Sequence, residues 1–206
     1  NMKYVINHEF VSISSHTANH RIILLHGWGA DADDLLPIGQ QIIEISKIDF
    51  EVISLRAPNI HPDNNGRQWY GLYPPDWNEA EREVNKLLLS LRQLGTLNIP
   101  LKKTILLGFS QGGAMAIDVG CKLDLGLIVS CSGYPHPNWI PEQTCPPIII
   151  SHGLMDEVVP ISASKNIYQK IKYVSQNFCE LKEFIGHHQI DTHLINHISL
   201  KIKQIF

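Results

Sequence analysis

Residues 106–113, LLGFSQGG, place Ser110 between two glycines directly after an apolar run. The next residues, AMAI, are small and apolar and predict the start of a helix. A sharp strand-to-helix turn needs flanking glycines because side chains would collide there. The turn also puts Ser110 at a helix N-terminus, where free N–H groups favour developing negative charge. The stretch predicts a nucleophilic serine, and an inert tight turn is the alternative.

Around this stretch, apolar runs and helix-like stretches alternate along the chain. The apolar runs cover residues 21–27, 51–57, 103–110, 125–133 and 146–153. The stretches with helical spacing cover residues 31–47, 78–95, 114–123, 161–176 and 192–206. Apolar runs without polar alternation are typical of strands covered on both faces of a parallel sheet. We therefore predict one α/β domain over residues 1–206, with ligands binding at the carboxyl ends of the strands.

The composition excludes several classes of protein. With 44% hydrophobic residues, a net charge of -3 and scattered lysines and arginines, the chain has no basic stripe for nucleic acid. No segment approaches eighteen uninterrupted apolar residues and the N-terminal stretch lacks a signal-peptide core, so we expect no integral membrane association. The cysteines form no Cys-x-x-Cys pair, and no Asn-x-Ser/Thr sequon occurs. Buried free thiols and a cytoplasmic location are expected.

Two later segments supply the base and the acid that a nucleophilic serine needs. A serine hydroxyl is a poor nucleophile unless a base takes its proton and an acid orients that base. In this architecture the expected chain order is Ser, then Asp or Glu, then His. Asp156 follows the last apolar run, with Glu157 as its neighbouring rival and a helix-capping role as the non-catalytic alternative. His187 and His188 follow a predicted strand over residues 180–185, and the residues alone leave open which of them is the base.

Five blocks of the chain resemble, in the same order, the bacterial carboxylesterase and acyl-protein thioesterase group of the α/β-hydrolases. The blocks are LLHGWGADADDL, RAP with the downstream GRQWYGL, GFSQGG, SHGLMDEVVP and GHHQI. The resemblance covers nearly the whole chain and implies the α/β-hydrolase fold, with helices flanking a mainly parallel sheet and no large cap domain. It implies Ser110 as nucleophile and Asp156 as orienting acid. It also implies His188 as base, because the histidine of the family lies two places before the isoleucine that is Ile190 here.

Two backbone N–H groups are expected to stabilise the oxyanion. One belongs to Gln111, the residue after the nucleophile, and the other to the loop after the first apolar run, residues 26–30. The resemblance points to the N–H of Trp28 in that loop. A tight strand-to-helix turn is the alternative role of the loop.

The longest irregular stretch, residues 58–77, contains an aromatic pair. We expect Trp69, Tyr70 and Leu72 to cover an acyl chain near Ser110, and the alternative is that they only pack the loop down. Members of the family that the chain resembles commonly carry an aspartate after the aromatic pair, where this chain has Gly71.

These observations predict a serine hydrolase that cleaves carboxylic esters or thioesters through an acyl-enzyme, with no cofactor. The expected substrate is a small or lipid-like acyl ester of short to medium chain length, with an acylated protein or a lysophospholipid as alternatives. A hydrolase-fold protein that binds a ligand without catalysis is the alternative of another class. His193 and His197 lie four apart on a predicted helix, but no third ligand follows at fitting spacing, so we expect no metal site.

Overall fold

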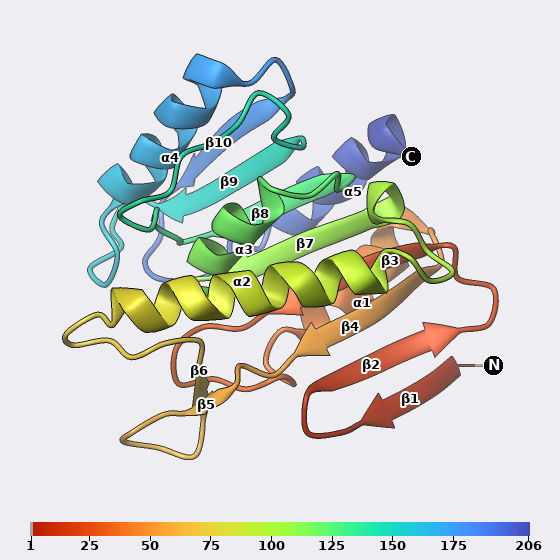
Figure 1. Cartoon of the computed structure of the whole chain (residues 1–206). Coiled ribbons are helices and arrows are strands. Elements are labelled where there is room, and N and C mark those ends of the chain that lie inside the picture. Colours follow the sequence, from red (N-terminus) through yellow and green to blue (C-terminus); the bar gives the residue numbers. More distant parts are fainter. Residues whose placement is uncertain (1) are drawn as a thin grey trace.

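The computed structural model describes residues 2–206. An eight-stranded sheet runs through the molecule in the order β1-β2-β4-β3-β7-β8-β9-β10 (Figure 1). Its strands are β1 (Met2–Ile6), β2 (Phe10–Ser15), β3 (His20–Leu25), β4 (Phe50–Leu55), β7 (Thr104–Phe109), β8 (Leu127–Cys131), β9 (Ile148–Gly153) and β10 (Cys179–Phe184). From β4 to β10 neighbouring strands pair in parallel, whereas β2 pairs antiparallel with both β1 and β4. The predicted mainly parallel sheet is confirmed.

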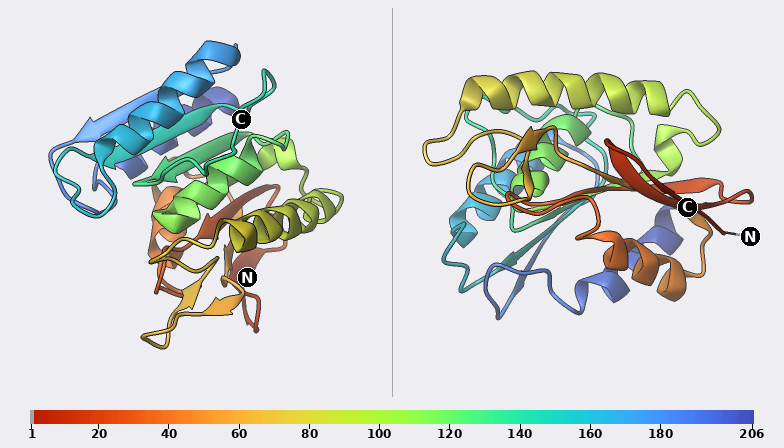
Figure 2. Two further views of the ribbon diagram at one scale, coloured as in Figure 1. Left: turned by 60° about the vertical axis from the view of Figure 1, so that its left-hand side comes forward. Right: turned by 90° about the horizontal axis from the view of Figure 1, so that it is seen from below.

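Helices cover both faces of this sheet (Figure 2). On one face lie α1 (Leu36–Ser46) and α5 (Leu194–Ile205), and on the other lie α2 (Trp77–Leu94), α3 (Gln111–Gly120) and α4 (Ile161–Val174). Alternate side chains of β3 feed the two cores: Ile22 and Leu24 pack with α1 and α5, while Ile23 and Leu25 pack with the other three helices. The double cover explains why these strands read as unbroken apolar runs.

Each predicted strand and helix is present, with shifted ends. The helix predicted from residue 31 begins at Leu36, five residues later. This start places Pro37 in the first turn, where a proline is tolerated because its missing N–H would have no partner inside the helix. The helix predicted from residue 114 begins at Gln111, directly after the serine. Within residues 2–206, no helix combines the length and the hydropathy that crossing a bilayer requires.

The hairpin of β1 and β2 at the N-terminal end of the described chain was not predicted from the sequence. Its signal is the apolar–polar alternation of FVSIS, in which Val11 and Ile13 reach the core on one face of β2. The long irregular stretch also contains a two-stranded sheet of β5 (Asn59–Ile60) and β6 (Arg67–Gln68). A short 3₁₀ helix, η1 (Leu101–Lys103), precedes β7.

The register of the parallel strands brings their carboxyl ends to one rim of the sheet. Leu25 pairs with Gly108, Phe109 pairs with Cys131, and the last residue of β9 pairs with Phe184. The loops that leave these strands therefore begin side by side, although they are up to about 160 residues apart in sequence. Each catalytic residue expected from the sequence lies on one of these loops.

Candidate active site

Ser110 stands at the turn between β7 and α3 in a strained conformation. Its φ is 58° and its ψ is -116°, a region that costs a residue with a side chain roughly 1–3 kcal/mol. The turn is held by the Ser110 N–H, which donates to the carbonyl of Cys131 at 2.8 Å. A Cβ on Gly108 would lie 2.0 Å from the carbonyl oxygen of Gly112, and a Cβ on Gly112 would lie 2.0 Å from that of Leu25. Gly108 is thus required by the turn itself, and Gly112 by the close approach of α3 to the end of β3.

His188 lies between the Ser110 hydroxyl and the Asp156 carboxylate. Its Nε2 is 2.9 Å from Ser110 Oγ, and its Nδ1 is 2.7 Å from Asp156 Oδ2. Because the carboxylate can only accept, Nδ1–H donates to it, and Nε2 is left to accept the hydroxyl proton. The structure brings these three residues together from the ends of β7, β9 and β10.

The carboxylate of Asp156 is fully buried and held by the backbone. Its Oδ1 accepts from the N–H groups of Val158 at 2.9 Å and Val159 at 2.8 Å. Burial by itself raises the pKa of this carboxyl, but the Val159 N–H, His188 and the Val158 N–H outweigh burial, so that its pKa is lowered. The group therefore stays ionised and can stabilise a positive charge on the His188 ring.

His152, on β9, also lies near this carboxylate, with its Nε2 3.4 Å from Asp156 Oδ2. Burial lowers the pKa of His152, so its ring is neutral. Its Nδ1 lies 2.6 Å from Ser164 Oγ and its Nε2 2.7 Å from the Val159 carbonyl. His152 was not predicted from the sequence, because its place inside an apolar run is the only signal it left.

The residues that the sequence left as alternatives for the base, the acid and a metal ligand lie outside the line from Asp156 to Ser110. His187 is exposed, and its Nδ1 is 3.1 Å from the carbonyl of Met155. Glu157 is exposed on the surface beside Asp156. His197, one of the histidines weighed as a metal ligand, pairs through Nε2 with Glu180.

The two N–H groups expected to bind the oxyanion face no acceptor within the described residues 2–206: neither the N–H of Trp28 nor that of Gln111 makes a hydrogen bond there. His26, before Trp28, is fully buried and accepts from the Ala57 N–H at 3.0 Å. Burial lowers the pKa of His26, which agrees with a neutral ring that shapes the loop.

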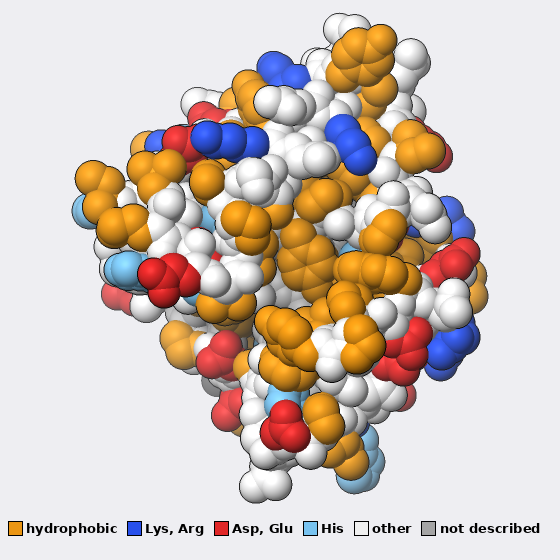
Figure 3. Space-filling view, turned by 90° about the vertical axis from the view of Figure 1, so that its left-hand side faces the viewer, with side chains coloured by type: hydrophobic (Ala, Val, Ile, Leu, Met, Phe, Trp, Pro, Cys, Tyr) orange, Lys and Arg blue, Asp and Glu red, His pale blue; other side chains and the backbone are white. Residues whose placement is uncertain are grey.

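A cavity of about 450 Å³ opens above Ser110 and His188. Its walls are mainly apolar and include Trp28, Leu72, Tyr134, Val159, Pro160 and Ala163. Figure 3 looks onto this rim and shows hydrophobic side chains gathered in the middle of the face. Such a lining suits the hydrocarbon part of an acyl ester.

Of the three predicted substrate contacts, the structure places only Leu72 in the cavity wall. Trp69 is 3% exposed and Tyr70 is fully buried. The Trp69 indole N–H donates to the carbonyl of His26 at 2.9 Å. The positions of Trp69 and Tyr70 thus favour the alternative, in which the pair packs the loop down.

A second Asp–His–hydroxyl chain lies behind the cavity and left no signal in the sequence. His136 Nδ1 is 2.7 Å from Asp118 Oδ2, and His136 Nε2 is 2.8 Å from the Tyr70 hydroxyl. That hydroxyl is 2.6 Å from the hydroxyl of Tyr134, whose ring lines the cavity. Lys122 Nζ completes the chain at 2.7 Å from Asp118 Oδ1.

Fold and site together define a serine hydrolase of the carboxylesterase and thioesterase type on an α/β-hydrolase scaffold. The chain belongs to the phospholipase/carboxylesterase family, whose sequence profile matches residues 6–205. The predictions of family, fold class and enzyme class are confirmed.

Relatives with known names agree with this assignment. The chain is 27% identical over 191 residues to acyl-protein thioesterase 1 of Saccharomyces cerevisiae, covering 81% of this chain and 82% of that protein. Its structure is similar to that of esterase PE8, with a TM-score of 0.80 and 26% identity over 95% of this chain and 97% of the other. It is also similar to SOBER1 of Arabidopsis thaliana, with a TM-score of 0.75 and 25% identity over 91% and 99% of the two chains.

Proposed function

We propose that the chain hydrolyses acyl esters and thioesters with Ser110 as nucleophile, His188 as general base and Asp156 as the acid that orients His188. The observation that carries the proposal is the continuous hydrogen-bonded line from Asp156 through His188 to Ser110, which opens onto an apolar cavity. A hydroxyl in this line can transfer its proton to the imidazole as it attacks a carbonyl carbon.

The reaction proceeds in two halves. In the first, Ser110 Oγ bonds to the acyl carbon while His188 Nε2 takes the hydroxyl proton, and the negative oxygen is stabilised by the N–H groups of Trp28 and Gln111. The tetrahedral species collapses, His188 returns its proton to the leaving alcohol or thiol, and an acyl-enzyme remains. In the second half, His188 activates a water molecule that releases the acid.

Short to medium acyl chains are the substrates that the proposal favours. The cavity is open to solvent at the rim of the sheet, and its apolar walls come from loops at that rim and from the first turns of α2 and α4. An acylated protein is the second candidate, because relatives of the chain are named acyl-protein thioesterase 1. Discrimination between these substrates depends on the shape of the pocket.

We include a reducing, cytoplasmic location in the proposal. All of the cysteines, Cys121, Cys131, Cys145 and Cys179, are buried free thiols. Burial raises the pKa of Cys131 to about 12, which keeps that thiol protonated and unreactive.

A panel of p-nitrophenyl esters from two to sixteen carbons, run beside an S-acylated peptide, tests the substrate range. We expect the highest kcat/KM at short to medium chain length, and a maximum at sixteen carbons would contradict it. A much higher kcat/KM for the peptide thioester than for any oxygen ester would favour the second candidate.

The same panel on His188→Ala and His187→Ala identifies the base. His188→Ala should lose about 10⁴-fold or more in kcat, whereas His187→Ala, an exposed neighbour with the same chemistry, should lose far less. Labelling of the wild-type protein with a fluorophosphonate tests the nucleophile. Folded protein that takes up no label on Ser110 would favour a binding protein without catalysis.

A further inference from the structure

Both residues expected to supply the oxyanion hole are held through their side chains by one short segment. This segment, residues 67–70, comprises β6 and the two aromatic residues after it, and we call it the strap. It lies in the long irregular stretch, more than forty residues from Gln111 in sequence and about forty from Trp28. The inference drawn from it rests on the proposed function.

The strap is tied to the Trp28 loop by backbone and side-chain bonds. The N–H of Gly29 donates to the carbonyl of Arg67 at 2.8 Å, and the N–H of Arg67 donates to the carbonyl of Ala30 at 2.7 Å. The Trp28 indole N–H donates to Gln68 Oε1 at 2.8 Å. The position of Trp28 on the rim therefore depends on Gln68 and on the backbone pairing beside it.

The strap is tied to Gln111 by a reciprocal pair of bonds. The backbone N–H of Trp69 donates to Gln111 Oε1 at 2.8 Å, and Gln111 Nε2 donates to the carbonyl of Tyr70 at 2.8 Å. Gln111 is fully buried, so a lost bond could not be replaced by solvent. Its side-chain amide, satisfied at both ends, has one orientation, and this fixes the first residue of α3.

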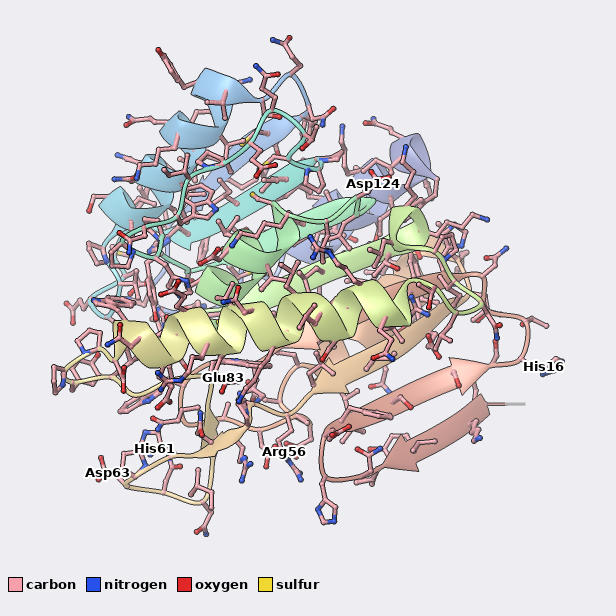
Figure 4. The ribbon with its side chains drawn as sticks, in the orientation of Figure 1. His16, Arg56, His61, Asp63, Glu83 and Asp124 are labelled. Carbon is pink, nitrogen blue, oxygen red and sulfur yellow. The ribbon has the colours of Figure 1, made fainter. Side chains whose placement is uncertain are left out.

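Further hydrogen bonds hold the strap to residues 57–59. The Arg67 guanidinium donates to the carbonyls of Ala57 at 3.0 Å and Pro58 at 2.9 Å. Asn59 Nδ2 donates to the Trp69 carbonyl at 3.2 Å. Figure 4 labels Arg56 and His61 in this part of the molecule, and the His61 ring packs on the Trp28 ring with centroids 4.0 Å apart.

We propose that the strap is a positioning element for the oxyanion hole, in which Gln68 sets the position of Trp28 and the Trp69–Tyr70 backbone sets that of Gln111. Oxyanion stabilisation depends on donors that are already in place when charge develops. A shift of about 1 Å at such a position can cost as much as 10²-fold in rate. Because the donors bind the transition state more strongly than the substrate, weakening the strap should lower kcat and leave KM nearly unchanged.

The test compares Gln68→Met with Trp28→Phe and with the double variant, using a short p-nitrophenyl ester. Gln68→Met keeps the length of the side chain and removes the acceptor, while Trp28→Phe cuts the same hydrogen bond from the other side and keeps the backbone N–H. We expect Gln68→Met to lose about tenfold in kcat with KM little changed. Trp28→Phe should lose at least as much in kcat and can also change KM, because its ring lines the cavity, and the double variant should lose no more kcat than Trp28→Phe alone.

A trifluoromethyl ketone, which forms a tetrahedral adduct with the serine, gives an independent reading. Its affinity for Gln68→Met should fall by the same factor as kcat/KM, because both depend on the same donors. Gln111→Met removes the bonds between Gln111 and the strap, and its kcat/KM and its affinity for the ketone should also fall by the same factor. Gln41→Leu, an amide-to-aliphatic change on the exposed face of α1, is the matched control and should keep wild-type kinetics.

Unchanged kcat in folded Gln68→Met and Gln111→Met would overturn the inference. So would a loss confined to KM, or single effects that multiply in the double variant. The proposed function is tested separately by the fluorophosphonate. Wild-type protein that is labelled on Ser110 while Gln68→Met keeps full kcat rejects only the strap, whereas unlabelled wild-type protein rejects the proposed function itself.

Discussion

Two Asp–His–hydroxyl chains of nearly equal geometry lie within this molecule. In the first, Asp156, His188 and Ser110 are joined by distances of 2.7 and 2.9 Å. In the second, Asp118, His136 and Tyr70 are joined by 2.7 and 2.8 Å. Hydrogen-bond distances alone therefore do not distinguish a catalytic line from a structural one.

The surroundings of the two hydroxyl groups are what differ. Ser110 stands on a strained turn and lines a cavity, and within residues 2–206 the N–H groups of Trp28 and Gln111 on the same rim make no hydrogen bond. Tyr70 is fully buried, its oxygen is already bonded to a second tyrosine, and burial raises the pKa of its hydroxyl. Because the buried Tyr70 hydroxyl has no access to substrate, we expect the second chain to contribute to stability and not to catalysis.

The largest expected difference between the two chains comes from removing each histidine. His188→Ala should lose about 10⁴-fold or more in kcat, because it removes the base that takes the Ser110 proton. His136→Ala should keep most of its kcat and lose about 2 kcal/mol of stability, equivalent to about 4–8 °C in Tm. Ester hydrolysis and calorimetry on both variants measure this. A loss of kcat in His136→Ala as large as that in His188→Ala would show that both chains serve catalysis.

Changing each aspartate to asparagine should give a smaller contrast. Asp156→Asn keeps the shape of the side chain but favours the wrong tautomer of His188, and we expect kcat to fall by up to about 10⁴-fold. Asp118→Asn should lower stability, since it weakens the bonds to His136 and Lys122, and should leave kcat near the wild-type value. Equal kcat values in the two variants would remove the distinction between the chains.

The pH dependence of stability should report both carboxylates. Burial raises the pKa of Asp118, but its bonds to His136 and Lys122 outweigh this, and its pKa is lowered, as is that of Asp156. A carboxyl whose pKa is lowered on folding stabilises the protein above its unfolded pKa, and this contribution is lost as the pH falls through the folded pKa. The urea midpoint of Asp118→Asn should therefore fall less steeply than that of the wild type between about pH 5 and pH 2. Parallel curves would show that Asp118 makes no such contribution.

The smallest effect is expected at the outer end of the second chain. Lys122 pairs with Asp118 one helical turn away, and its side chain is 39% exposed. Such pairs contribute about 0.3–0.5 kcal/mol, so Lys122→Met should shift the urea midpoint only slightly and leave kcat unchanged. A shift as large as that of His136→Ala would mean that the ion pair, and not the buried imidazole, holds the network.

Much of the site could be predicted from the sequence because it depends on local rules. Gly108 is required by a contact within the turn itself, so the stretch around Ser110 indicates both the turn and its nucleophile. Asp156 and His188 follow predicted strands, and parallel strands bring their carboxyl ends to one rim. The choice of His188 over His187 came from the resemblance to the family, and the geometry agrees with it.

The roles of Trp69 and Tyr70 could not be predicted from local sequence rules. An aromatic pair in a long loop predicts either a substrate contact or a packing contact. Only the tertiary structure shows that both rings are buried, that the Trp69 indole donates to the carbonyl of His26, and that the Tyr70 hydroxyl is hydrogen-bonded to Tyr134 and His136. The same holds for Asp118, which lies on α3, and His136, which lies 18 residues later in the loop after β8. No periodicity or motif links them.

The sequence by itself determined the alternation of strands and helices, the serine turn and the class of enzyme, because each follows from contacts between residues close in the chain or from motifs in a fixed order. The tertiary structure alone decided which aromatic side chains line the cavity, how the second Asp–His–hydroxyl chain is assembled, and how one segment holds two distant loops. These outcomes depend on contacts between residues far apart in sequence, whose distances are set only when the sheet is assembled.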